Sequence, residues 1–323
     1  MKILAMVHGF PPHHNAGAEW MLYDMLKYLV DRGHKCVVYL SDTKYADEYN
    51  YNGIEVKIDE FNKRKEELKT TDIVFSHLDR YGKALNIAEF YRKPYVLIVH
   101  NTHPYSSIAE KHKPNAHERF VYCVYNSEYT RDALHYPNPS VIVHPPVNAE
   151  RVKTKRGDKI TLINCWADKG GLVLQEIARL MPDHNFIGVK GGYGEQEICK
   201  LKNIKYLENT PDIRKVYAQS RIVLMPSKYE SYGRVAVEAM ASGIPVIAEA
   251  TPGLKESLGD AGIFCDRNNP EQWVEVIKKL DDEKAYKAAS MAAVKRFAEI
   301  QALTEAEMKG FEEFLINVIN KKA

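Results

Sequence analysis

Glu230 and Glu238 stand eight positions apart in the sequence, with Gly233 and Arg234 between them. Gly233 is placed to open a helix, which would leave the backbone N–H groups near Ser231–Arg234 unpaired and available to an anion such as a phosphate. Glu238, about a turn and a half further along, could accept hydrogen bonds from both hydroxyls of a ribose, with Glu230 on the sugar side of the phosphate. A pair of glutamates at this spacing could equally be two solvated charges on a helix. The surrounding sequence is therefore needed to distinguish a binding site from a solvated helix face.

The elements around this segment follow an alternation of apolar strands and amphipathic helices. Lys2–Val7 is a buried strand, a helix that carries Met21–Leu29 stops at Gly33, and Cys36–Leu40 is the next strand. This is a βαβ unit of the parallel-sheet type. Further strands of the first half are expected at Ile73–Ser76, Tyr95–Val99, Val121–Tyr125 and Val141–Val143.

The second half repeats this scheme. A helix at Tyr232–Ser242 ends at Gly243, with Pro245 beyond it, and the chain after Cys265 is helical to its end. The Glu230 segment directly follows one of the predicted strands. The strands expected in this half are Ile160–Cys165, Asn185–Val189, Ile204–Leu207, Arg221–Met225, Val246–Ala248 and Gly262–Cys265.

The alternation divides the chain into two α/β domains. The first is predicted at residues 1–147 and the second at 159–305, joined by a linker at 148–158 that lacks periodicity and followed by a last helix at 306–323. Two doubly wound domains imply a cleft between them, because ligands of open α/β sheets bind outside the carboxyl ends of the strands.

Composition limits the kinds of protein that fit. Of 323 residues, 45% are hydrophobic and 27% charged, as in a soluble globular protein, and no run of about 18 apolar residues could span a membrane. The net charge of +2 is too weak to argue for nucleic acid or a membrane. Five scattered cysteines without a C-x-x-C pair indicate reduced core thiols, and Met1–His8 does not have the features of a signal peptide. We expect a cytoplasmic protein, at most peripheral at a membrane.

The segment Glu230-Ser-Tyr-Gly-Arg-Val-Ala-Val-Glu238, followed by Gly243 and Pro245, resembles the E-x7-E segment of the retaining glycosyltransferases of family GT4. The resemblance implies the GT-B fold, in which two Rossmann-like doubly wound domains face each other across a cleft. It also implies transfer of a hexose-type sugar from a nucleotide-diphosphate sugar, a UDP- or GDP-sugar, to an acceptor hydroxyl. In that family the last helix, here 306–323, commonly crosses back to the amino-terminal domain.

Two further loops of the second half are similar to loops of the family. Asp168–Gly171 resembles the lysine-glycine loop whose lysine holds the donor diphosphate, which makes Lys169 the candidate cation. A positive charge is needed there because the leaving nucleoside diphosphate gains charge as the glycosidic bond breaks. A solvated loop lysine is the alternative. Lys190–Gly194 resembles a second donor loop and makes Gly192 a donor-binding candidate, although a glycine cluster alone indicates only a turn.

Two loops of the first half are also similar to loops of the GT4 family. Pro11–Glu19 resembles the Gly-Gly loop near the donor phosphates and the acceptor, and of that glycine pair only Gly17 is present. Tyr95–His100 resembles the strand that ends in a histidine facing the transferred sugar. A histidine that satisfies local backbone groups is the alternative for His100. Asn148 stands where the family often has aspartate.

The resemblance implies a role for each candidate. Glu230 would orient the hydroxyls of the donor sugar, Glu238 would bind the ribose, and His100 would help to position the sugar near the reacting centre. Lys169 would bind the diphosphate together with the start of the helix that follows Glu230. The residues of that helix start are Ser231, Tyr232, Gly233 and Arg234. The anomeric configuration would be retained, and no residue needs to act as a covalent nucleophile.

One departure from the family concerns the cations. The family usually pairs its lysine with an arginine a few residues earlier, but no arginine lies between Arg156 and Arg179, and Asn164 is near that position. Arg234 or Lys190 would have to take the place of the missing arginine beside Lys169. Arg234 is favoured because it lies in the turn expected to face the phosphate.

No metal and no cofactor is expected beyond the nucleotide sugar as co-substrate. The chain contains no Asp-x-Asp sequence, which a metal-chelating diphosphate site of the other large glycosyltransferase fold would show. Activity is therefore expected to survive a chelator. Several histidines could converge on a cation, but their spacing is irregular: His8, His13, His14, His100 and His103.

Other classes of function remain open. A sugar-nucleotide epimerase or hydrolase of the same architecture would turn over the donor without an acceptor, and a non-catalytic nucleotide- or glycan-binding protein would bind without turnover. A dinucleotide dehydrogenase is disfavoured because His8–Pro12 has no G-x-G-x-x-G. The acceptor stays undecided among a glycan, a lipid-linked sugar, a small molecule, a protein and modified DNA. Lys63–Lys65 and Arg151–Arg156 could touch phosphates, but small charge runs are more often solvated.

Overall fold

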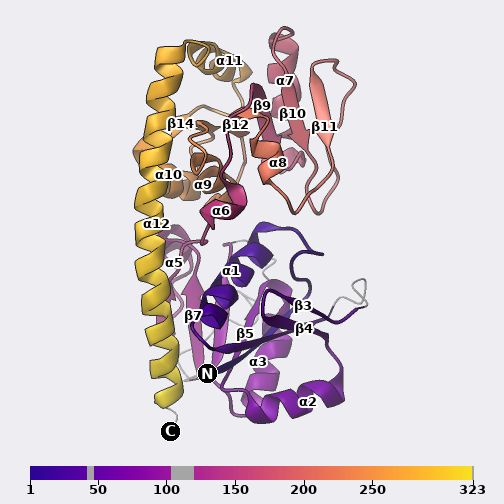
Figure 1. The fold of residues 1–323 in the computed structure, drawn as a ribbon, viewed down its shortest axis with the longest axis vertical. Helices are drawn as coiled ribbons and strands as arrows, with labels where there is room; N and C mark the ends of the chain where they lie inside the picture. Colours follow the sequence, from indigo (N-terminus) through magenta and orange to yellow (C-terminus); the bar gives the residue numbers. More distant parts are fainter. Residues whose placement is uncertain (42–46, 103–119, 322–323) are drawn as a thin grey trace. The chain divides into compact units, whose positions relative to one another are not determined.

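The computed structural model describes residues 1–41, 47–102 and 120–321. The chain forms two compact units, one made of Met1–Pro146 with Thr304–Ala323 and the other of Val147–Leu303. Each unit is built on its own largely parallel sheet (Figure 1), which confirms the predicted α/β class. Within the described ranges, no helix combines the length and the apolarity needed to cross a bilayer.

The sheet of the first unit has the strand order β3-β4-β2-β1-β5-β6-β7-β8, and all neighbouring strands are parallel except β3 and β4. Its strands are β1 (Lys2–Val7), β2 (Lys35–Leu40), β3 (Tyr49–Tyr51), β4 (Ile54–Ile58), β5 (Ile73–His77), β6 (Tyr95–Val99), β7 (Val121–Tyr125) and β8 (Ser140–Ile142). Its described helices include α1 (Gly17–Asp31), α2 (Phe61–Thr70), the short turn η1 (Leu78–Arg80), α3 (Tyr81–Phe90) and α5 (Glu128–Leu134).

Strand β1 shows why the sequence of this sheet reads as continuous apolar runs. Ile3, Ala5 and Val7 pack in one core cluster, and Leu4 and Met6 pack in another. Successive side chains of a strand point to opposite faces, so a parallel sheet covered on both faces needs an apolar residue at every position.

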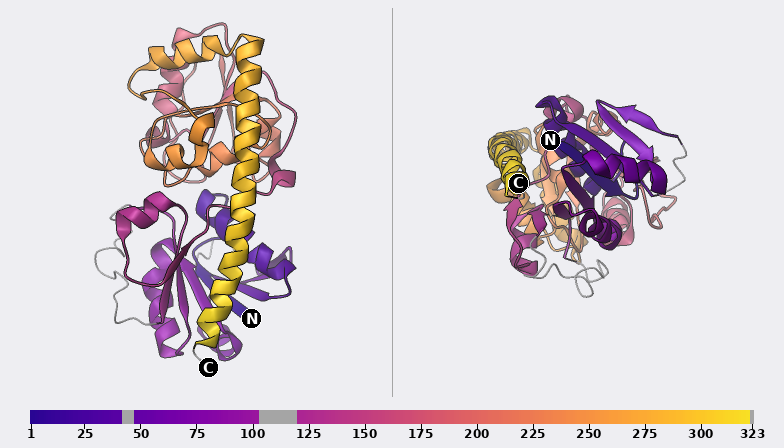
Figure 2. Two further views of the ribbon diagram at one scale, coloured as in Figure 1. Left: turned by 90° about the vertical axis from the view of Figure 1, so that its left-hand side faces the viewer. Right: turned by 90° about the horizontal axis from the view of Figure 1, so that it is seen from below.

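The carboxyl-terminal part of α12 (Glu283–Asn320) completes the core of the first unit. Met308, Phe311, Leu315 and Val318, spaced by three or four residues, belong to the same core cluster as Ile3 and Val7. In Figures 1 and 2 this part of the helix, drawn in yellow, lies alongside the first unit. The amino-terminal sheet is therefore covered by residues from the other end of the chain.

This last helix is longer than predicted. The prediction began it at 306, whereas one helix of 38 residues runs from Glu283 to Asn320. No proline interrupts this segment and Gly310 is its only glycine, so nothing in it stops a helix. Phe297 and Ile300, in its first half, are buried in a core cluster of the second unit.

The second unit has a six-stranded parallel sheet of order β11-β10-β9-β12-β13-β14. Its strands are β9 (Lys159–Ile163), β10 (Phe186–Val189), β11 (Ile204–Leu207), β12 (Ser220–Met225), β13 (Val246–Ala248) and β14 (Ile263–Phe264). Its helices include α6 (Ala149–Val152), the turn η2 (Ala167–Lys169), α7 (Gly171–Leu180), α8 (Arg214–Tyr217), α9 (Arg234–Met240), α10 (Pro252–Leu258), the turn η3 (Gly259–Ala261) and α11 (Pro270–Lys279).

Strand order places the candidate loops beside one another. In the second unit β9 lies between β10 and β12, so the turns that follow β9 and β12 are neighbours. In the first unit β1 lies between β2 and β5, so the loops that follow β1 and β5 are neighbours. Open α/β sheets bind ligands at such switch points, outside the carboxyl ends of the strands.

Candidate active site

The turn after β9 brings Lys169 to Glu230. The turn ends at Gly170, whose backbone is left-handed (φ 101°), and a Cβ there would lie 2.2 Å from Pro226 Cγ. The lysine turn therefore rests directly on the end of β12. Lys169 Nζ lies 2.6 Å from Glu230 Oε1, although 61 sequence positions separate the two residues.

The Lys169–Glu230 pair is largely shielded from water, with 22% of the lysine side chain and 15% of the glutamate side chain exposed. Ser227 Oγ donates a hydrogen bond to the same carboxylate oxygen at 2.9 Å. Burial lowers the pKa of Lys169, but the charge of Glu230 and the hydrogen bond to it more than offset this effect and raise the pKa above its ordinary value. Lys169 is thus held as a cation, and a phosphate would compete with Glu230 for it.

Glu238, in α9, is the centre of a second polar group. Gly233 caps α9 with a left-handed backbone (φ 93°), and a Cβ there would lie 2.5 Å from Leu254 Cδ2, so the position requires glycine. Arg234 Nε lies 2.8 Å from Glu238 Oε1, and Tyr217 Oη donates to Oε2 at 3.0 Å. A carboxylate oxygen can accept more than one hydrogen bond, so both oxygens of Glu238 keep acceptor capacity for hydroxyls such as those of a ribose.

The other predicted residues of the second unit have different surroundings. Tyr232 is only 2% exposed, and its side chain packs in the core. Gly192 lies exposed in the loop after β10, where Lys190 Nζ pairs with Glu208 Oε1 at 2.5 Å. Asn164 has a left-handed backbone (φ 72°), and its Oδ1 accepts a hydrogen bond from the N–H of the residue two positions on. Asparagine is one of the few residues that favour this backbone conformation.

Two cations that the sequence did not single out lie beside the lysine turn. Lys228 Nζ is 2.7 Å from Asp168 Oδ1, and Arg267 Nη2 donates to the backbone oxygen of Ala167 at 3.3 Å. Both also line a hollow of about 330 Å³ that includes Thr251 and Asn268. Arg267 follows β14, far from the lysine in the sequence, and no motif marks it.

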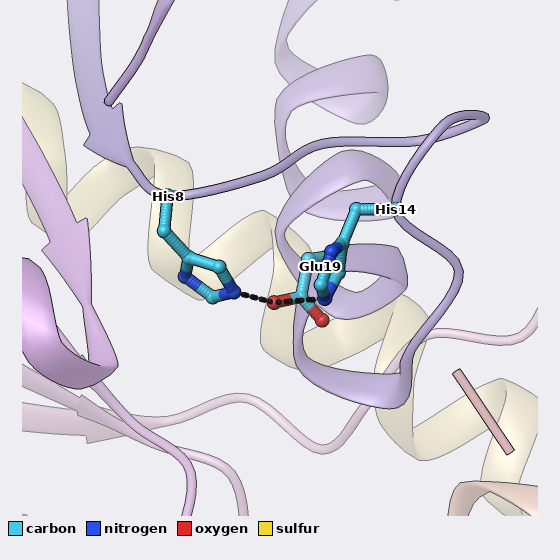
Figure 3. A group of neighbouring side chains, drawn as sticks. All are labelled: His8, His14 and Glu19. Carbon is cyan, nitrogen blue, oxygen red and sulfur yellow. Dashed lines mark ion pairs between the residues drawn. The ribbon is translucent and has the colours of Figure 1, made fainter. Parts of the chain in front are cut away.

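In the first unit, the loop after β1 carries a cluster of two histidines and a glutamate (Figure 3). His8 Nε2 lies 3.2 Å and His14 Nε2 lies 3.7 Å from Glu19 Oε1. Glu19 is 1% exposed, and burial, with a smaller contribution from the charge of Asp79, raises its pKa to about 7. His13, which the sequence grouped with these histidines, instead packs edge-on against the ring of Tyr49.

His100 directly follows β6 and is 9% exposed. Its Nε2 is 2.9 Å from Nδ1 of His77, which ends β5 and is fully buried. Burial lowers the pKa of His100 to about 3, and burial also holds the pKa of His77 well below its ordinary value. Both imidazoles are therefore neutral near pH 7. His103 lies outside the described residues.

Gly17 occupies an open position. A Cβ there would meet nothing within 4 Å, and its φ lies outside the left-handed range, so the protein itself does not require glycine at this place. Gly9 is the crowded glycine of the loop, because a Cβ on it would lie 2.7 Å from His14. The close contact between the backbone of the loop and the His14 side chain therefore depends on Gly9, which the sequence did not indicate.

Solved structures share this architecture. Sucrose-phosphate synthase of Thermosynechococcus elongatus superposes with a TM-score of 0.79 at 14% identity, covering 99% of this chain and 100% of that chain. HepE of Anabaena, in complex with UDP-glucose, gives a TM-score of 0.74 at 19% identity, covering 99% and 100%. The two Rossmann-like units are those of the GT-B glycosyltransferases, as predicted.

Two family models match the chain: Glycosyltransferase Family 4 over residues 15–151 and Glycosyl transferases group 1 over residues 195–296. The chain belongs to the GT4-type glycosyltransferases. Its curated relatives include the D-inositol 3-phosphate glycosyltransferases of Corynebacterium diphtheriae, 33% identical over 32% of this chain and 26% of the relative, and of Rhodococcus opacus, 41% identical over 26% and 19%. The matched part spans about a quarter of these relatives' length or less.

Proposed function

We propose that this chain is a retaining glycosyltransferase that moves a hexose-type sugar from a nucleotide-diphosphate sugar to an acceptor hydroxyl. The observation that carries the proposal is the pairing of Lys169 with Glu230 at the switch point of the second unit, eight positions before Glu238. A cation with a carboxylate beside it, and a second carboxylate in α9, match the diphosphate, sugar and ribose of one donor. HepE, which shares the fold, was solved with UDP-glucose, so UDP-glucose is the first donor to test.

In the proposed reaction, the donor diphosphate binds to Lys169 and the sugar hydroxyls donate hydrogen bonds to Glu230. As the glycosidic bond breaks, negative charge grows on the leaving diphosphate, and Lys169 stabilises it together with backbone N–H groups near Ser231–Arg234. The acceptor hydroxyl attacks from the face that the diphosphate leaves and passes its proton to the departing diphosphate, so the anomeric configuration is retained. His100 is neutral and acts as a hydrogen-bonding group that positions the sugar.

We infer that the diphosphate is bound without a metal ion. Lys169 supplies positive charge directly, Arg267 lies beside its turn, and the chain has no Asp-x-Asp sequence. The affinity for the nucleoside diphosphate should be the same with and without EDTA. Binding that appears only after Mg²⁺ or Mn²⁺ is added would overturn this part of the proposal.

Thermal unfolding with UDP, GDP, ADP, CMP and dTDP, each with and without EDTA, tests the donor site. A ligand at a hundred times its Kd stabilises the folded protein by about 2.7 kcal/mol, which a melting curve resolves. Lys169→Met should abolish most of the response, whereas Lys215→Met, at a lysine that is 79% exposed, should leave it intact. Equal responses in the two variants, or none from any nucleotide in the unmodified protein, would remove the support for the site.

Kinetics separate the two carboxylates. Glu230→Ala should lower kcat strongly, whereas Glu238→Ala should chiefly raise the donor KM. The reverse pattern would exchange their roles. Acceptor candidates to screen are glycans, lipid-linked sugars, small molecules, proteins and modified DNA, with D-inositol 3-phosphate first because relatives are named for it.

Two other functions give different results in the same assays. Donor turnover that needs no acceptor would identify an epimerase or hydrolase. Nucleotide binding without any turnover would identify a non-catalytic binding protein.

A further inference from the structure

Two imidazoles and one carboxylate meet in the loop between β1 and α1, outside the residues assigned to donor binding. His8 directly follows β1, His14 lies in the loop, and Glu19 lies in the first turn of α1. One ligand atom from each of the three residues lies within 4.8 Å of the other two. Figure 3 shows the imidazoles approaching the carboxylate from opposite sides.

Glu19 is the unusual member of this cluster. Its side chain is 2% exposed, its Oε1 faces both imidazoles, and its Oε2 is buried without a hydrogen-bond partner. A buried carboxylate oxygen without a partner is strongly unfavourable, and buried polar atoms are nearly always satisfied. A cation between the imidazoles and the carboxylate would supply the missing partner.

The donor set indicates which cation. Two imidazole nitrogens and one carboxylate oxygen are ligands that Zn²⁺ takes in proteins, leaving a fourth position for water or a substrate oxygen. We propose that His8, His14 and Glu19 form a binding site for one divalent transition-metal ion of the zinc class. All three residues belong to the first unit and none is a cation proposed for the diphosphate, so the proposal stands whether or not the chain transfers sugars.

The surroundings of the cluster hold both imidazoles in place. His8 Nδ1 lies 3.5 Å from Asp79 Oδ1, and metal-binding histidines commonly have a carboxylate on their second nitrogen. His14 lies against Gly9, where a Cβ would be only 2.7 Å away. Tyr49 Oη donates to the backbone oxygens of Phe10 and Pro11, at 3.2 and 3.0 Å, and ties the loop to the hairpin of β3 and β4.

Metal affinity of the full chain, stripped of ions by EDTA and then freed of chelator, tests the proposal without any nucleotide. Zn²⁺ is titrated in competition with a chromophoric chelator, and Co²⁺ binding is followed by its visible absorption, which is strong for four-coordinate ions. One ion per chain is expected. His14→Ala and Glu19→Gln should each weaken binding by more than tenfold and remove the Co²⁺ spectrum, and Asp79→Asn should weaken it by about 10–100-fold.

His13→Ala is the matched control, because His13 is the adjacent histidine and packs against Tyr49 instead of Glu19. It should bind Zn²⁺ as the unmodified protein does. Circular dichroism checks that each variant is folded. If His14→Ala does not fold, Glu19→Gln still tests the site. Equal Zn²⁺ affinities of the unmodified protein, His13→Ala and Glu19→Gln would overturn the site, as would equal losses in His13→Ala and His14→Ala.

Discussion

Glu230 Oε1 accepts hydrogen bonds from both Lys169 Nζ, at 2.6 Å, and Ser227 Oγ, at 2.9 Å. The cation proposed for the diphosphate is therefore engaged by the carboxylate proposed for the sugar. A complete donor offers a new partner to each of them, whereas a nucleoside diphosphate without its sugar binds the lysine and leaves Glu230 with Ser227 but without a cation. With the proposed roles, we expect this arrangement to favour the intact donor over the product.

The first prediction follows from this competition. Glu230→Gln removes the charge that holds Lys169, so the affinity for the nucleoside diphosphate alone should rise roughly three- to tenfold, equivalent to about 1 kcal/mol, while kcat falls. Isothermal titration calorimetry measures the affinity. Glu208→Gln, which removes the exposed carboxylate paired with Lys190, is the control and should change neither quantity. A weaker affinity in Glu230→Gln would mean that Glu230 does not compete with the ligand for Lys169.

A second prediction separates the two arginines near the site. Arg234 holds Glu238, so Arg234→Gln should weaken the binding of both the nucleoside diphosphate and its nucleoside, because both contain the ribose. Arg267 lies beside the lysine turn, so Arg267→Gln should weaken only the diphosphate, by roughly three- to tenfold. Titrations with the two ligands distinguish these effects. If Arg234→Gln weakens only the diphosphate, Arg234 is the substitute for the missing family arginine.

A third prediction concerns pH. Burial lowers the pKa of His100 from 6.5 to about 3, so the folded protein binds fewer protons than the unfolded chain between these values, and stability must fall as the pH falls through that range. Between pH 7 and pH 5 this histidine alone should account for about 2 kcal/mol of lost unfolding free energy. In urea unfolding, His100→Gln should lose less stability over this interval. His135→Asn, at an exposed histidine, should lose as much as the unmodified protein.

A fourth prediction concerns α12. Gly310 is exposed, and a Cβ there would meet nothing within 4 Å. Gly310→Ala should raise the free energy of unfolding by about 0.5–1 kcal/mol, because alanine loses less backbone freedom in a helix. The neighbouring exposed position serves as the control, and Lys309→Ala should change stability by less than about 0.5 kcal/mol. Lower stability in Gly310→Ala would show that this part of the helix is not formed as described.

Sequence patterns predicted the fold class and the places of most strands, because buried parallel strands such as Lys2–Val7 need uninterrupted apolar residues. They missed the hairpin of β3 and β4, although its turn, Asn52–Gly53, has left-handed residues at both positions (φ 53° and 90°), as the Asn-Gly pair favours. The last helix began earlier than expected because nothing in Glu283–Asn320 signals a boundary.

Local patterns also found Lys169 and Glu230 but not their contact. That contact depends on β9 and β12 being neighbours, which strand order decides and local sequence does not. Arg267 and Glu19 were missed for the same reason, since each is brought to its partners only by the arrangement of the strands or the path of the loop.

The packing of α12 against the first sheet has a consequence for synthesis on the ribosome. One face of that sheet is covered by Met308, Phe311, Leu315 and Val318, which are translated only after the 157 residues of Val147–Leu303. At about 5–20 residues per second, the nascent first unit waits roughly 8–30 s with this apolar face uncovered. During that interval the uncovered apolar face makes the nascent unit prone to aggregation, and a ribosome that stalls before residue 304 releases a sheet that cannot complete its core.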